Sequence, residues 1–158
     1  MTELAIGDNA PEFMLPRDGG PMVSLSDFAG KKVVLYFYPK DDTPGCTKEA
    51  IDFTQLAAHF IANNTVILGL SNDSVKKHDK FVAKHKLGIA LLSDEKVEIC
   101  KKYGTWQEKS MYGKSYMGIE RTTFLISADG IISHIWRKVK VPGHVDVVLT
   151  AASEANVK

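Results

Sequence analysis

Residues 33–49 of this 158-residue chain read VVLYFYPKDDTPGCTKE, an apolar run that ends at Pro39, followed by a turn that leads to Cys46. The run from Val33 to Pro39 is continuous and rich in β-formers, which is typical of a strand buried on both faces. Beyond it, apolar residues recur at steps of three and four, which predicts a helix with one buried stripe: Cys46, Ala50, Phe53, Ala57 and Phe60. A site is expected where the strand ends and the helix begins, as in other α/β sheets.

The same patterns extend to both ends of the chain. Strands are expected at 11–15, 22–24, 65–70, 90–92, 121–127 and 131–136, and helices at 74–86 (ended by Gly88), 94–103 (closed by Gly104) and 143–154. Turn residues dominate 105–118, which is expected to be a long loop of the kind that is usually functional or mobile. This order predicts a three-layer α/β fold, a central mixed sheet flanked by helices with an N-terminal β-hairpin. We expect one domain within residues 1–158, with its folded part from about Ile6 to Ala152.

Composition excludes several classes of protein. A hydrophobic fraction of 44% supports a core, and a formal net charge of +1 argues against nucleic-acid or membrane-surface binding. Residues 1–10 lack the basic start and apolar run of a secretory signal, and no apolar stretch is long enough to span a membrane. Two cysteines make a poor disulfide framework, so a reducing cytoplasm is the expected setting.

Cys46 occupies a chemically favoured position. Pro44 suits the first position of a helix, and Thr43 then caps it, with its side-chain oxygen expected to accept from the N–H of Cys46. The sulfur of Cys46 would lie in the first turn, beside unpaired N–H groups and the positive end of the helix dipole. Both favour the nucleophilic thiolate. The alternative is that Cys46 is a small core hydrophobe on the buried stripe.

Pro39, Thr43 and Cys46 form the pattern Pro-x-x-x-Thr-x-x-Cys, which resembles the active-site signature of the peroxiredoxin family. The stretch 43–49, TPGCTKE, is similar to the bacterioferritin-comigratory, or Q-type, branch of that family. The similarity covers nearly the whole domain and includes further matches at 7–13, 92–94, 103–106, 120–126 and 129–130.

The resemblance implies a thioredoxin-like fold and a thiol peroxidase that reduces hydrogen peroxide and organic hydroperoxides through a Cys46 sulfenic acid. It implies that Thr43 and Arg121 hold the peroxide oxygens and the thiolate, and that Pro39 shields Cys46 from water. Arginine suits two closely spaced oxygens because its donors form a fixed fork. The alternative for Arg121 is a structural ion pair with Glu49 or Glu120.

The chain departs from the family at the resolving cysteine. Many Q-type members carry one on the same helix, where this sequence has Ile51, and others carry one at positions matching 81–84, where there is none. Cys100 has apolar neighbours at helical spacing and is expected to be a buried structural thiol. We therefore predict a one-cysteine cycle completed by an external reductant such as glutathione, glutaredoxin or thioredoxin, in a monomer or weak homodimer.

Other chemistries lack their motifs. A disulfide exchanger needs Cys-x-x-Cys, where Glu49 stands, and a cysteine phosphatase needs an arginine where Asp52 stands. No short ligand spacing joins the histidines, since His78 and His85 lie two turns apart, and no glycine-rich phosphate loop is present. No metal and no cofactor are expected. A non-enzymatic thiol redox sensor or holdase remains the alternative function.

Overall fold

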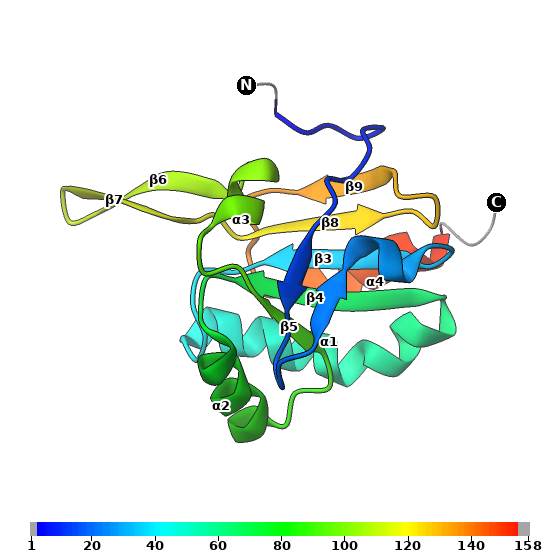
Figure 1. Cartoon of the computed structure of the whole chain (residues 1–158), viewed down its shortest axis with the longest axis horizontal. Helices are drawn as coiled ribbons and strands as arrows, with labels where there is room; N and C mark the ends of the chain where they lie inside the picture. Colours follow the sequence, from blue (N-terminus) through cyan, green and yellow to red (C-terminus); the bar gives the residue numbers. More distant parts are fainter. Residues whose placement is uncertain (1–2, 155–158) are drawn as a thin grey trace.

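Five strands form the central sheet of the computed structural model, which describes residues 3–154 (Figure 1). Their order across the sheet is β5-β4-β3-β8-β9. β3 (Lys32–Phe37), β4 (Thr65–Ser71) and β5 (Ala90–Ser93) run parallel, whereas β8 (Thr122–Ile126) and β9 (Ile132–Trp136) complete the sheet in antiparallel pairs. The predicted mixed sheet is confirmed.

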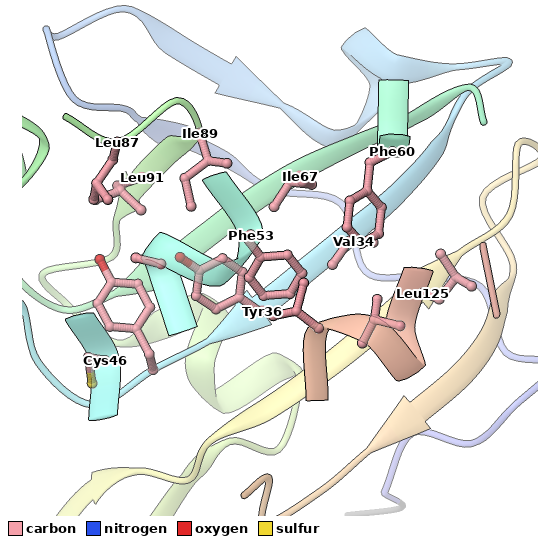
Figure 2. Packing of buried hydrophobic residues seen from close by; sticks show 14 of the residues in the cluster. Val34, Tyr36, Cys46, Phe53, Phe60, Ile67, Leu87, Ile89, Leu91 and Leu125 are labelled. Carbon is pink, nitrogen blue, oxygen red and sulfur yellow. The ribbon is translucent and has the colours of Figure 1, made fainter. Parts of the chain in front are cut away.

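Alternation along β3 divides the core into two halves. Val34 and Tyr36 face α1 (Pro44–Ala62), α4 (His144–Glu154) and Phe81 of α2 (Val75–His85), and together these form the cluster seen in Figure 2. On the opposite face, Val33, Leu35 and Phe37 pack against the 3-10 helix Leu25–Phe28 and α3 (Glu98–Lys102). Layers on both sides of the sheet confirm the three-layer prediction. None of the helices within residues 3–154 is long and apolar enough to cross a membrane.

The predicted N-terminal hairpin is present as β1 (Met14–Pro16) and β2 (Met22–Ser24), which pair antiparallel. Hydrogen bonds join this hairpin to β5 of the central sheet. The Asp18 carboxylate accepts from the backbone N–H of Leu91 at 3.0 Å, and the Asp18 N–H donates to the Leu91 carbonyl at 2.9 Å. This hairpin therefore closes one face of the core rather than standing apart from it.

Two helix predictions need correction. Lys86, in the left-handed conformation with φ 52°, ends α2, so Gly88 does not. The helix expected at 94–103 spans only Glu98–Lys102, because Val97 is also left-handed, with φ 55°. The Asp94 carboxylate accepts from the Cys100 N–H at 2.8 Å and so stabilises the turn that precedes this short helix.

The loop expected at 105–118 is instead a hairpin of β6 (Trp106–Met111) and β7 (Lys114–Ile119), which extends beyond the body of the protein (Figure 1). Tyr112 and Gly113 form its two-residue turn, with φ of 54° and 77°. Positive φ at both positions matches a type I′ hairpin turn. The sequence conceals this hairpin because tyrosine seldom adopts that conformation and because the exposed strands carry no alternation of apolar and polar residues.

Candidate active site

Cys46 is the third residue of α1, immediately beyond the loop that follows β3. Pro44 opens the helix as predicted, since the first helical N–H would have no intrahelical partner. The Cys46 side chain is 1% exposed, carries a free thiol and lies at the end of the row of core residues in Figure 2. The apolar stripe of α1 thus places the sulfur at the margin of the core, beside the positive end of the helix.

Arg121 immediately precedes β8, and its side chain contacts the Cys46 sulfur. Its Nη2 donates to Cys46 Sγ at 3.3 Å, and its Nη1 donates to Glu49 Oε1 at 2.7 Å. The register that pairs Phe37 with Thr122 brings Arg121 to the end of β3, next to the start of α1. A Cβ on Gly45 would lie 3.2 Å from Arg121 Nη2, so glycine lets the guanidinium approach closely. Arg121 therefore contacts the Cys46 sulfur and pairs with Glu49 at the same time.

Glu49 is part of this site, although the sequence suggested it only as an alternative ion-pair partner of Arg121. Its side chain is 0% exposed, and its Oε2 has no hydrogen-bond partner among the described residues. Burial raises the pKa of Glu49 from 4.5 to about 7, although the charge and hydrogen bonds of Arg121 oppose the rise. Its position three residues after Cys46, on the same helix face, was the signal that could have identified it.

Thr43 and Pro39 lie in the loop between β3 and α1, as expected from the sequence. The Thr43 hydroxyl donates to the Lys40 carbonyl at 2.9 Å, and no side-chain cap bond from the Cys46 N–H is present. The predicted capping bond is therefore wrong. The backbone carbonyl of Thr43 instead accepts the Thr47 N–H at 2.8 Å, as the first bond of the helix.

Cys100 lies in the other half of the core. It is 0% exposed and packs with Phe37 and Tyr103, on the face of the sheet opposite Cys46. Burial, together with the nearby Asp94, raises the pKa of the Cys100 thiol well above its ordinary value. The predicted burial of this cysteine is confirmed.

These elements define a class of protein: an α/β redox protein with a thiol at a helix start and an arginine against its sulfur. The sequence model of the AhpC/TSA family matches residues 6–135. A putative peroxiredoxin bcp of Coxiella burnetii is 53% identical over 146 residues, covering 92% of this chain and 97% of the relative. The chain belongs to the peroxiredoxin family, in its Bcp or Q-type branch.

Solved structures agree with this assignment and with a thioredoxin-like fold. The bacterioferritin comigratory protein of Xanthomonas campestris superposes with a TM-score of 0.87 at 46% identity, covering 91% of this chain and 92% of its own. A cysteine-to-serine variant of Xylella fastidiosa PrxQ gives a TM-score of 0.93 at 40% identity, with 100% of both chains covered.

Replacing Glu49 with glutamine tests the raised pKa of this carboxyl. A folded-state pKa above the unfolded value means that ionisation of Glu49 opposes folding, so the parent loses stability as pH rises from 4.5 to about 7. Glu49→Gln removes this charge and should not show that loss. We expect the free energy of unfolding of the variant, relative to the parent, to increase between pH 4.5 and 8. Urea denaturation at each pH measures it, and a difference that does not change with pH would contradict the raised pKa.

Proposed function

We propose that this protein is a thiol peroxidase that reduces hydrogen peroxide and organic hydroperoxides through a sulfenic acid on Cys46. The observation that supports it most is the 3.3 Å contact between Arg121 Nη2 and Cys46 Sγ at the start of α1. A guanidinium and a helix N-terminus both favour the thiolate, which is the nucleophile. The bacterioferritin comigratory protein of Xanthomonas campestris has alkyl peroxide reduction activity, which is consistent with organic hydroperoxides as substrates here.

The proposed first step transfers one oxygen atom. The Cys46 thiolate attacks the nearer peroxide oxygen, an S–O bond forms, and the O–O bond breaks. Sulfur is oxidised to sulfenic acid, and the leaving oxygen takes a proton and departs as water or an alcohol. Negative charge builds on that oxygen, so donors fixed around it lower the barrier.

Each site residue has a proposed part in this step. Arg121 would hold the thiolate and the peroxide oxygens with its planar fork, while Glu49 fixes the orientation of that fork through Nη1. The Thr43 hydroxyl hydrogen is directed to Lys40, so the Thr43 oxygen would accept the O–H of the incoming peroxide. Pro39, which has no N–H, would form the wall of the pocket and limit the access of water to Cys46.

We propose a one-cysteine cycle for the return to the thiol. Cys46 and Cys100 belong to core clusters on opposite faces of the sheet, and a disulfide needs their Cα atoms within about 7 Å. The central sheet lies between the two cysteines, so this pairing would require unfolding. An external thiol would instead condense with the sulfenic acid and release water, and a second thiol would free Cys46.

The reductant is proposed to be glutathione, glutaredoxin or thioredoxin. Such a cycle needs a supply of reduced thiol, which is why we propose a cytoplasmic setting. We also propose a single domain over residues 1–158, of which 1–2 and 155–158 lie outside the described residues, acting as a monomer or weak homodimer.

Cysteine variants test which thiol reacts. Cys46→Ser should abolish peroxide consumption in the presence of a thiol reductant, because serine does not supply a comparable nucleophile. Cys100→Ser, the matched control, should keep most of the activity because its side chain lies on the other face of the sheet. Equal losses in the two variants would overturn the assignment, and stoichiometric oxidation without turnover would favour a redox sensor.

Replacing Arg121 with lysine tests whether the planar guanidinium, rather than its positive charge alone, is needed for the reaction. Lysine keeps the positive charge but cannot bond Cys46 and Glu49 with fixed geometry, so the rate constant for peroxide reduction should fall on the order of 10²-fold. Stopped-flow measurement with hydrogen peroxide gives that constant, and circular dichroism checks that the variant is folded. A folded lysine variant that reacts at the parent rate would make Arg121 purely structural.

Intact-mass measurement tests the cycle. One equivalent of peroxide without thiol should add one oxygen atom to the protein, and excess peroxide should carry Cys46 to the sulfinic acid. Glutathione added after the first equivalent should yield a mixed disulfide on Cys46. A loss of two hydrogens, with Cys46 and Cys100 linked in the peptide map, would reject the one-cysteine cycle.

A further inference from the structure

A buried polar network lies beside the loop that carries Pro39 and Thr43. Asp41, in the middle of this loop, accepts from the Tyr38 hydroxyl at 2.6 Å through Oδ1 and faces His78 Nδ1 at 2.6 Å through Oδ2. Its backbone N–H donates to the Asp73 carboxylate at 2.8 Å. Asp41 therefore connects the loop to the end of β3, to α2 and to the segment after β4.

The hydrogen bonds of His78 define its charge. Its side chain is 0% exposed, and Nε2 lies 2.9 Å from the Leu92 carbonyl oxygen, which can only accept, so Nε2 carries a hydrogen. Nδ1 faces the Asp41 carboxylate, whose other oxygen already accepts from Tyr38, so Nδ1 donates as well. A ring with hydrogens on both nitrogens is an imidazolium. If either nitrogen lost its hydrogen, its lone pair would face the lone pair of the oxygen to which it now donates, so that hydrogen bond would be lost.

The other charged groups around the ring come from three elements. Among the described residues, the titratable groups that interact with His78 are Tyr38 at the end of β3, Asp41 in the loop and Asp73 after β4. Burial raises the pKa of Tyr38 well above its ordinary value, which keeps its hydroxyl as a donor. Burial opposes the charge on His78, but the hydrogen bond and charge of Asp41 outweigh it and raise the pKa of His78.

The donor atoms of Asp41, Asp73 and His78 also lie within 4.8 Å of one another, a spacing that a metal ion could use. However, hydrogen bonds engage the atoms that would bind it. His78 Nδ1 pairs with Asp41, and Asp73 Oδ2 accepts from the Asp41 N–H and the Ser71 hydroxyl. The arrangement is that of a satisfied hydrogen-bond network.

The loop has a second, weaker attachment to α2. Asp42, with φ 61°, pairs with Lys84 at 2.7 Å and with His85 at 2.9 Å, and both pairs are exposed to solvent. Exposed pairs of this kind contribute little to stability because water and salt screen the charges. The buried His78–Asp41 pair is therefore the firmer attachment of the loop.

We propose that His78 is a positioning residue for the reaction at Cys46: its doubly protonated ring holds Asp41, and Asp41 holds the loop that presents Thr43 and opens α1. The inference rests on the proposed peroxidase function. When the ring loses a proton, one of its two hydrogen bonds is lost and the loop loosens, so the reaction slows at alkaline pH.

The test compares stopped-flow rate constants for hydrogen peroxide from pH 5.5 to 9.5 in the parent, His78→Asn and His85→Asn. His78→Asn should lower the constant 10-fold to 100-fold at neutral pH, since small misplacements of reacting groups have effects of about this size. It should also remove the alkaline decline that the proposal predicts for the parent. His85→Asn, the matched control on the same helix, should stay within about twofold because Lys84 still holds Asp42.

Two further measurements keep the inference testable if His78→Asn does not fold. Nitrogen NMR of the histidine rings in the parent should find both His78 nitrogens protonated at pH 7, and a neutral ring would overturn the proposal. Asp41→Asn should reproduce the kinetic effect, and the double variant should lose no more than either single one, because the two residues act through each other.

The outcomes separate this inference from the proposed function. A parent that does not react with peroxide rejects the function itself. If the parent reacts and a folded His78→Asn variant has the same rate constant at every pH, only the role of His78 is rejected. The same conclusion follows if His85→Asn lowers the rate constant as much as His78→Asn does. A metal chelator should leave all the rate constants unchanged. If the chelator lowered the rate constant and added zinc restored it, the network would have to be reinterpreted as a metal site.

Discussion

The guanidinium of Arg121 joins the parts of the molecule on which the site depends. One nitrogen reaches the Cys46 sulfur and another the Glu49 carboxylate, across 75 and 72 residues of sequence respectively. This contact exists because β8 pairs with β3 in the register that sets Thr122 opposite Phe37. A one-residue slip would turn every side chain of β8 to the other face, taking both the core contacts and the site with it.

The contact also explains why a carboxylate is buried so close to a nucleophile. A buried glutamate without a partner is costly, but Glu49 pairs with the guanidinium that contacts the Cys46 sulfur and so fixes the position of that guanidinium. The Glu49 carboxylate and the Cys46 sulfur both bond the guanidinium of Arg121, through Nη1 and Nη2 respectively. Gly45 is part of this arrangement, since a side chain there would crowd Arg121.

A second set of contacts holds the loop in front of the site. Asp41 and Asp42 attach it to α2. The helix contributes His78, Lys84 and His85, which pair with those acids. These pairs hold the loop against α2.

The sequence by itself determined the class of fold, the buried strand that leads to Cys46, the position of the thiol in the first turn of α1 and the burial of Cys100. These follow from local patterns, namely continuous apolar runs, helical spacing and the proline at the helix start. Tertiary structure alone decided the partners. No local pattern shows that Arg121 contacts Cys46, that Thr43 bonds Lys40 rather than the helix, or that His78 meets Asp41. It also placed a β6–β7 hairpin at 105–118, where the cross-strand hydrogen bonds fix a turn with Tyr112 in the left-handed conformation. Left-handed Val97 shortened the helix before Gly104.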